Sequence, residues 1–337
     1  MQNTMQNTEM RKRPRQSSTY NTKRRKLRAQ NVDKSILTRQ QAIEADFRSN
    51  ELMQGLPSHA ADEFEQPRLR KCPFAPDTIK WESAIKLGDG YDGCAWKVAF
   101  GNEGTFVLKV FWDSQPPQTR NGYFAPQREC QNAAILQMIE AVLEEGPVSL
   151  CFEYPETRAQ AMSNMLAFAL PHRNIQRSPA AESSHVVLSH PPPIRKCYGW
   201  LDFDGDLIKR MPYRIKPQPR KYDKPPHSMS PGNSYYAIVY EYIPDDNNTP
   251  ELIKTLLRFF YLVGFSFTCS PTIENWKGSR LIDGSDIVHP GGVGWNVQYY
   301  GSPWVAAALL RPDPILESEG SINNNHVIER TFMMRLD

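Results

Sequence analysis

Residues 81 to 143 constrain the fold most, because their pattern changes from short alternating strands to one long apolar helix. Alternation of apolar and polar residues predicts strands over residues 84–87, 95–99 and 105–111, with glycine-containing turns between them. Apolar residues at helical spacing then predict a helix over residues 126–143. Strands followed by a separate helix predict an α+β domain.

The second half of the chain continues this mixed pattern. It predicts a helix over residues 157–170 and strands over 197–203 and 236–243. A helix is expected to begin at Thr249, because a capping hydroxyl, a first-turn proline and an early acid follow one another there, and to end near residue 263. A shorter helix is predicted over residues 304–310.

The first 30 residues form a basic arm. They contain nine Lys or Arg and one acid, a net charge of +8, so the remaining residues carry −5 to give the overall +3. Almost no large apolar residue is present, which predicts disorder. Two basic clusters separated by seven polar residues are typical of a bipartite nuclear import signal. The residues expected to contact an import receptor are Arg11, Lys12, Arg13, Arg15, Lys23, Arg24, Arg25 and Lys26.

A solubilising tail that binds nucleic acid nonspecifically is the alternative interpretation of this arm, and the two roles are compatible. The mildly acidic remainder has no electrostatic tendency to bind nucleic acid. The six cysteines form no CxxC pair or metal-ligand cluster, and no apolar run approaches the length of a membrane span. We therefore expect a soluble nuclear protein without a membrane partner.

Residues 33–53 carry Ile36, Ile43 and Phe47 at helical spacing, which predicts a short amphipathic helix within the arm. Such a helix would dock an unidentified protein partner. The alternative is a marginal helix that lies on its own domain or frays, because isolated helices of this length are weak.

Residues 88–93 spell a GxGxxG motif through Gly88, Gly90 and Gly93. The motif lies between two predicted strands, so it indicates a hairpin over a nucleotide rather than a dinucleotide-binding turn at a helix start; an ordinary glycine turn is the alternative. Lys109 lies in the strand predicted over residues 105–111, which is the second strand after the motif. Glu129 comes 20 residues later in the predicted helix and would supply the carboxylate that a buried lysine needs.

This combination resembles the small lobe of a protein kinase. The resemblance implies that Lys109 would hold the α- and β-phosphates of ATP and that Glu129 would orient Lys109. It also implies that the strand around Glu241 is the hinge whose backbone faces an adenine. In the alternative, Lys109 extends to solvent from its strand and Glu129 lies at the surface.

The segment after residue 263 resembles the kinase large lobe less closely. Asn275 is similar to the end of a catalytic loop, and Asp283 to the aspartate that holds magnesium, so both are candidate metal ligands. Ser270 stands where a kinase carries its base aspartate, and no His-Arg-Asp occurs. The alternative for Asp283 and Asp286 is a pair of turn carboxylates beside a glycine.

Residues 257–300 resemble fungal kinase-like proteins that are grouped with an inner-kinetochore complex subunit family, which implies a nuclear, centromere-associated scaffold. The fold expected from these resemblances is a bilobal kinase-like fold with an antiparallel-sheet small lobe and a shortened helical large lobe. The expected segments are an arm at 1–70, a small lobe at 75–243 with insertions at 155–193 and 204–234, a large lobe at 244–311 and a tail at 312–337.

Three functions follow as hypotheses. The first is a nonenzymatic nuclear scaffold built on a pseudokinase, because the aspartate base is missing and the large lobe is short. The second is an atypical kinase of low activity that uses ATP and magnesium, since phosphoryl transfer depends mainly on positioning and metal electrostatics. The third is a nucleic-acid-binding protein that acts through its basic arm.

Overall fold

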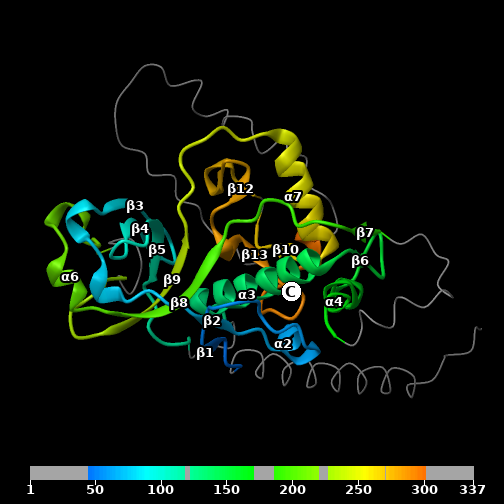
Figure 1. Ribbon diagram of the computed structural model, residues 1–337, viewed down its shortest axis with the longest axis horizontal. Helices are drawn as coiled ribbons and strands as arrows, with labels where there is room; N and C mark the ends of the chain where they lie inside the picture. The colour runs from blue at the N-terminus through cyan, green and yellow to red at the C-terminus, as the bar shows by residue number, and fades with distance from the viewer. Residues whose placement is uncertain (1–44, 118–121, 171–185, 220–226, 270, 301–337) are drawn as a thin grey trace, which may run out of the picture.

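The computed structural model describes residues 45–117, 122–170, 186–219, 227–269 and 271–300, and these form a mixed α+β fold (Figure 1). The predicted α+β class is therefore confirmed. The arm over residues 1–44, the helix predicted over 304–310 and the tail lie outside the described residues.

A seven-stranded mixed sheet is the largest element, with strand order β1-β2-β8-β9-β5-β4-β3. Its last five strands pair antiparallel, and each lies within two residues of its predicted bounds. Alternating burial along β4 and β8 explains why period-two patterning located them. These strands are β3 (Ile85–Asp89), β4 (Gly93–Ala99), β5 (Thr105–Phe111), β8 (Cys197–Asp204) and β9 (Ser234–Glu241).

Two further strands correct the expected arm boundary and the expected purely antiparallel sheet. β1 (Arg48–Leu52) pairs parallel with β2 (Leu69–Lys71), which pairs parallel with β8. The arm predicted to reach residue 70 is therefore wrong for residues 45–70. The helix predicted over 33–53 is wrong for its described part, and its residues 33–44 lie outside the described chain.

Long-range aromatic packing explains why β1 replaces the predicted helix. The Arg48 guanidinium lies 4.4 Å from the ring centroid of Trp200 and 4.6 Å from that of Tyr236. Phe47 packs against the same Tyr236 ring and against Phe124. These contacts join residues about 75 to 190 positions apart by sequence number, so helical spacing within the segment could not reveal them.

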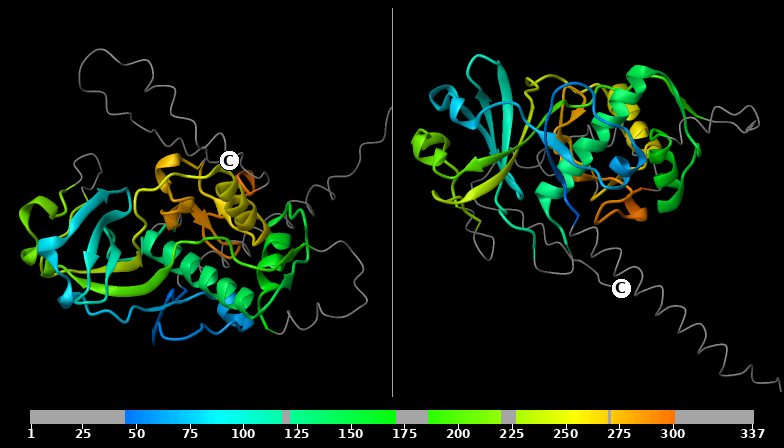
Figure 2. Two further views of the ribbon diagram at one scale, coloured as in Figure 1. Left: turned by 45° about the horizontal axis from the view of Figure 1, so that its top comes forward. Right: turned by 60° about the horizontal axis from the view of Figure 1, so that its bottom comes forward.

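Helix α3 (Ala125–Glu145) lies between the sheet and the rest of the molecule (Figure 2). Ala133 and Ala134 pack on the sheet with Val107, whereas Ile135 and Ile139 belong to a second hydrophobic core. The helix is therefore buried along two sides, which explains its long apolar sequence.

The second core is built from the other helices and several short ribbons. α7 (Pro250–Leu262) runs along it, and α4 (Arg158–Leu166) packs against α7. Within residues 244–300 as described, α7 is accompanied only by two-residue strands and short 3-10 turns. These strands are β10 (Ser266–Phe267) paired with β13 (Ile287–Val288), and β11 (Trp276–Lys277) paired with β12 (Arg280–Leu281). Earlier in the chain, β6 (Val148–Ser149) pairs with β7 (Val187–Leu188).

Two predicted insertions instead contribute to packing in their described parts. Met165 and Phe168 are fully buried beside α7 in the second core. In the other insertion, Ile215 is buried and its carbonyl accepts a hydrogen bond of 2.8 Å from Trp96 Nε1. The remaining elements are α2 (Ala61–Glu65), α6 (Leu207–Arg210), η1 (Pro76–Thr78), η2 (Trp81–Ser83), η3 (Tyr213–Ile215), η4 (Ile273–Asn275), η5 (Gly284–Asp286) and η6 (Val297–Tyr299).

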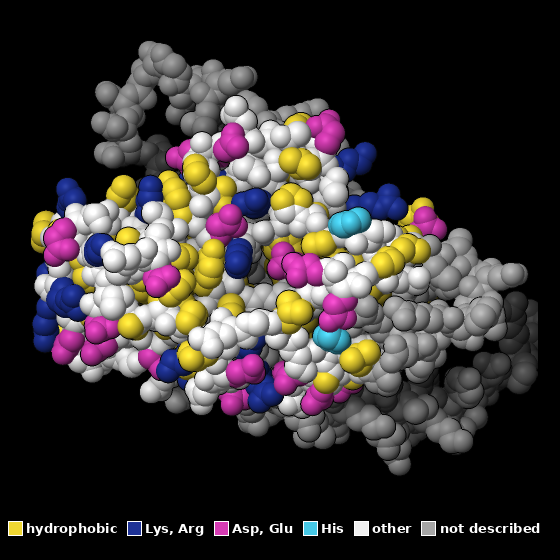
Figure 3. All heavy atoms as spheres, viewed as in Figure 1, with side chains coloured by type: hydrophobic (Ala, Val, Ile, Leu, Met, Phe, Trp, Pro, Cys, Tyr) yellow, Lys and Arg dark blue, Asp and Glu magenta, His cyan; other side chains and the backbone are white. Residues whose placement is uncertain are grey.

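The face shown in Figure 3 carries Lys, Arg, Asp and Glu side chains interspersed with apolar ones. No helix among the described residues combines the length and the apolar character needed to cross a bilayer.

The folded role of residues 45–70 predicts a large effect of truncating Phe64, whose side chain is fully buried in the second core. Phe64→Ala is expected to lower the free energy of unfolding by about 3–5 kcal/mol because it leaves a cavity. Leu56→Ala, in the same segment but 63% exposed, should change it by less than about 0.5 kcal/mol. Urea titration of both variants measures this. Equal small effects would show that the segment does not belong to the core.

Candidate functional site

An ion triad lies where the sheet, α3 and η5 meet. Lys109 Nζ lies 2.5 Å from Glu129 Oε1 and 2.9 Å from Asp283 Oδ1. The Glu129 side chain is fully buried and that of Lys109 is 14% exposed. The predicted pairing of Lys109 with Glu129 is therefore confirmed, and the interpretation in which both side chains lie at the surface is wrong.

The second carboxylate oxygen of Glu129 is also bonded. Tyr240 donates its hydroxyl to Glu129 Oε2 at 2.9 Å, and its ring is buried in β9. A Cβ on Gly284 would lie 3.4 Å from Glu129 Oε2 and from the Tyr240 hydroxyl, so the backbone of η5 closes this side. Sequence reasoning did not select Tyr240, which is one of three tyrosines in β9 and carries no signal that distinguishes it from the others.

The charges of the triad are strongly coupled. Burial alone would raise the pKa of Asp283, but the Lys109 ammonium and a bond from Ser285 hold it at about 2. Burial raises the pKa of Glu129 to about 7, against the opposing effect of Lys109. Burial would lower the pKa of Lys109, but the charges of Asp283 and Glu129 raise it above its ordinary value. Lys109 is therefore protonated and Asp283 ionised at neutral pH.

Asp283 is fixed by its own turn as well as by Lys109. The Ser285 hydroxyl donates to Asp283 Oδ1 at 2.8 Å and the Ser285 backbone N–H donates to it at 3.2 Å. Asp283 therefore acts both as a turn carboxylate, as in the alternative from sequence, and as a partner of the strand lysine.

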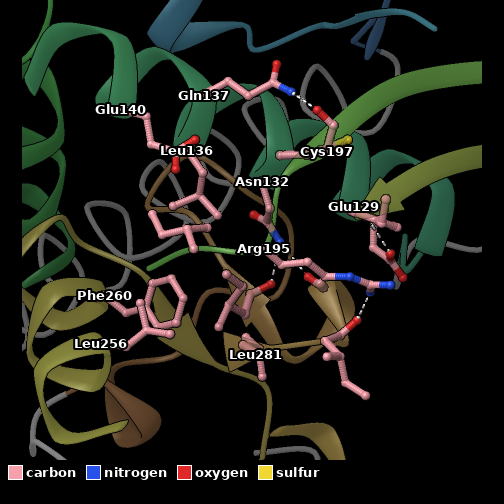
Figure 4. Close-up of a pocket in the computed structure, with 16 residues that line it drawn as sticks. Glu129, Asn132, Leu136, Gln137, Glu140, Arg195, Cys197, Leu256, Phe260 and Leu281 are labelled. Atoms are coloured by element: carbon pink, nitrogen blue, oxygen red, sulfur yellow. Dashed lines mark hydrogen bonds between the residues drawn. The ribbon is translucent and has the colours of Figure 1, made fainter. Parts of the chain in front are cut away.

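Arg195 holds the segment before Asp283 in place, and sequence reasoning did not select this residue. Its Nη1 donates to the Ile282 carbonyl at 2.5 Å (Figure 4). Its Nε donates to the Glu241 carbonyl at 3.1 Å. Its guanidinium lies 4.5 Å from the ring centroid of Tyr240. Arg195 thus joins the end of β9 to the residue that precedes Asp283.

Asn275 and Asp283, the predicted metal ligands, lie near each other but are not bonded to each other in the structure. Asn275 Nδ2 donates instead to Asp286 Oδ2 at 2.6 Å. Burial, and then the charge of Asp283, raise the pKa of Asp286 to about 6. Among the described residues, no group of three or more His, Cys, Asp or Glu is arranged to hold a metal ion. Asp286, which the sequence offered only as a turn residue, thus belongs to the site.

The three glycines of the motif have different surroundings in the β3–β4 hairpin. A Cβ on Gly93 would lie 2.1 Å from the Val110 carbonyl oxygen, so close strand packing requires glycine there. A Cβ on Gly88 would have no atom within 4 Å. A Cβ on Gly90 would have only the Gly93 carbonyl oxygen within that distance. The predicted hairpin between two strands is confirmed, and its Gly88 and Gly90 leave open space.

Glu241, the predicted hinge residue, is occupied by other contacts. Its backbone N–H donates to the Lys196 carbonyl at 2.8 Å, and its carbonyl accepts from Arg195. Its carboxylate accepts a bond of 3.0 Å from Arg280 Nη1. Glu241 therefore links β9 to β12 rather than presenting its backbone to a ligand.

A cavity of about 50 Å³ lies beside Glu129, between α3, Arg195 and the second half of α7 (Figure 4). Its lining is mainly apolar, including Leu136 and Phe260. Burial, with the neighbouring charge of Glu144, raises the pKa of Glu140 at its edge to about 7. The cavity therefore lies between Glu129 of the triad and residues of the second core such as Phe260.

Comparison with known proteins found no matching family model, no similar curated protein and no similar solved structure. Ser270, where the resemblance implies a base aspartate, lies outside the described residues.

The buried triad predicts a large stability effect for Glu129→Ala. The substitution leaves the Lys109 ammonium with one carboxylate and the Tyr240 hydroxyl without its acceptor, so we expect a loss of about 3–5 kcal/mol. Glu63→Ala, which removes the more exposed pair with Arg68, should cost less than about 1 kcal/mol. Denaturant titration compares the two. A Glu129→Ala loss within the range of the control would contradict the buried triad.

Proposed function

We propose that this chain is a pseudokinase, a kinase-like bilobal domain that works as a nonenzymatic nuclear scaffold. The observation that carries this proposal is the triad, because a strand lysine meets both a helix glutamate and a later aspartate beside a glycine hairpin. Residues separated by 20 and by 174 positions converge there, which a chance surface lysine would not explain.

The arrangement of elements supports a small lobe and a large lobe. The five antiparallel strands and α3 would form the small lobe, and α7 with the short ribbons would form a reduced large lobe. Residues 45–71 add β1 and β2 to the small lobe, and α4 joins the large lobe. The small lobe would therefore begin before the expected residue 75. The large lobe would include a helix that precedes the expected boundary at residue 244.

Some residues around the triad and the glycine hairpin fit a nucleotide with a magnesium ion. Lys109 would neutralise phosphates, and the open space at Gly88 and Gly90 would admit them beneath the hairpin. Asp283, with the oxygen atoms of Asn275 and Asp286, would hold the magnesium ion. Magnesium would supply the charge neutralisation that a single lysine cannot.

Catalysis is less well supported than binding. A serine hydroxyl at position 270 offers neither charge nor a matched pKa to accept a proton near neutral pH. Residues 244–300, as described, contain one helix of more than one turn, which leaves little surface to dock an acceptor. We therefore place the function in protein contacts rather than in phosphoryl transfer.

An atypical low-activity kinase is the second candidate, and Asp286 is the observation in its favour. Its pKa of about 6 and its bond from Asn275 are properties of a positioned proton acceptor. This candidate would replace the missing aspartate with one from a different segment.

Nuclear location is part of the proposal and rests on the basic arm. The clusters around Arg13 and Lys23 would bind an import receptor, and nonspecific nucleic-acid binding would also fall to the arm, because charges of both signs alternate on the folded face in Figure 3. Association with centromeres follows only from the resemblance of residues 257–300 and is proposed on that ground.

Phosphate transfer is expected to stay at background even if ATP binds. Loss of general-base help typically removes about two to four orders of magnitude in rate. ATP turnover and autophosphorylation should therefore be equal for the wild type, Lys109→Met, Asp283→Asn and the exposed control Lys209→Met. Robust wild-type turnover that is lost in Asp283→Asn and kept in Lys209→Met would show a true kinase, and Asp286→Asn would then test the second candidate.

Removing the positive charge of the arm should abolish nuclear accumulation. We expect a fluorescent fusion to leave the nucleus when Arg11, Lys12, Arg13, Lys23, Arg24, Arg25 and Lys26 are replaced by neutral residues, because receptor binding depends on these charges. A control that neutralises Lys80 and Lys209 on the folded part should stay nuclear. Unaltered accumulation of the arm variant would contradict the import signal.

A further inference from the structure

An acidic residue lies at the tip of the glycine hairpin. Asp92 directly precedes Gly93, and its Oδ2 accepts a hydrogen bond of 2.7 Å from the Tyr123 hydroxyl. Its backbone carbonyl accepts a second bond of 3.0 Å from the Trp112 N–H. Both the side chain and the backbone of Asp92 are therefore fixed.

The bond from Tyr123 holds the carboxylate on the side of the sheet that carries Lys109. Tyr123 lies two residues before α3, and α3 covers that face, as its Glu129 shows by reaching Lys109. Tyr123 is itself anchored, because the Arg128 guanidinium lies 4.1 Å from its ring centroid. Arg128 in turn donates to the Ser285 carbonyl at 3.3 Å, next to Asp283.

The charge of Asp92 adds to an already acidic surrounding. It raises the pKa of Lys109, of Glu129 and of Asp286, so it acts on the triad and on the carboxylate beside it. Burial, and then the charge of Asp92, raise the pKa of Tyr123 far above neutrality, so its hydroxyl remains a donor. Arg128 donates to carbonyl groups, and its charge also interacts with Asp92, Glu129 and Asp286, which oppose the lowering of its pKa by burial. Lys109 and Arg128 therefore lie among four carboxylates, those of Glu129, Asp283, Asp286 and Asp92.

We propose that Asp92, positioned by Tyr123, is a built-in competitor for phosphate that makes this site reject nucleoside triphosphate without a divalent cation. This inference rests on the proposed nucleotide site. A triphosphate under the hairpin brings its negative charges toward a carboxylate that cannot turn away without losing the Tyr123 bond. A bound divalent cation offsets that repulsion, so the effect of Asp92 should be largest when the metal is absent.

The test compares the affinity of the full chain for ATP with excess magnesium and with EDTA. Asp92→Asn should bind metal-free ATP at least roughly tenfold more tightly than the wild type, as expected for one nearby charge. Its affinity for magnesium ATP should change much less. Asp89→Asn is the matched control, since Asp89 lies in the same hairpin but is paired with Lys86 at 2.5 Å and should leave metal-free binding within about twofold.

Tyr123→Phe is a second variant that keeps the ring under Arg128 and releases the Asp92 carboxylate. It should also gain affinity for metal-free ATP, by less than Asp92→Asn does. Unchanged metal-free affinity in both variants would overturn the inference, and so would an equal gain in Asp89→Asn, which would indicate a general charge effect. In either case magnesium ATP would still bind, and the proposed nucleotide site would stand. Absence of magnesium ATP binding by the wild type would overturn the nucleotide site and this inference together.

Discussion

The buried ammonium of Lys109 determines how the parts of this protein fit together. A charge removed from water is tolerated only when carboxylates and hydrogen bonds surround it. Glu129 and Asp283 supply those partners from α3 and from the segment that begins η5. The sheet, α3 and the second core must therefore meet at one point, and displacement of any of them would leave a charge unpaired in the interior.

Hydrogen bonds from side chains to backbone carbonyls also hold this junction together. Arg195 donates to carbonyls on both sides of the junction, and Arg128 donates to the Ser285 carbonyl. Asn132 on α3 donates to the carbonyls of Gly284 and Ile287 at 3.0 and 2.6 Å. Since each bond requires a particular carbonyl orientation, this set fixes the backbone around Asp283 more closely than apolar packing would.

Local patterning predicted β5, α3 and the pairing of Lys109 with Glu129, because each depends on short-range periodicity or on one charge that must be neutralised. It failed for β1, where Phe47 at helical spacing is held instead by Tyr236 and Phe124. It also failed to pair Asn275 with Asp286, since that contact depends on the turn of η5. A contact between distant segments decides the first case. The second joins residues 11 positions apart through an irregular turn, which has no periodic pattern to reveal it.

Lys109 already pairs with two carboxylates, and this pairing determines how a phosphate ligand would reach its ammonium group. A phosphate group that approaches Lys109 must compete with Asp283, which at 33% side-chain exposure is the more accessible of its two partners. Weakening the bond between Lys109 and Asp283 also weakens the link between the sheet and η5. Binding of such a ligand would therefore be coupled to the joint between the two parts, and such coupling is reciprocal. A partner protein that stabilises the joint would lower the affinity for phosphate, and a nucleotide would alter the surface offered to that partner. This coupling would need no catalytic step, so it would be available to the nonenzymatic scaffold that we propose.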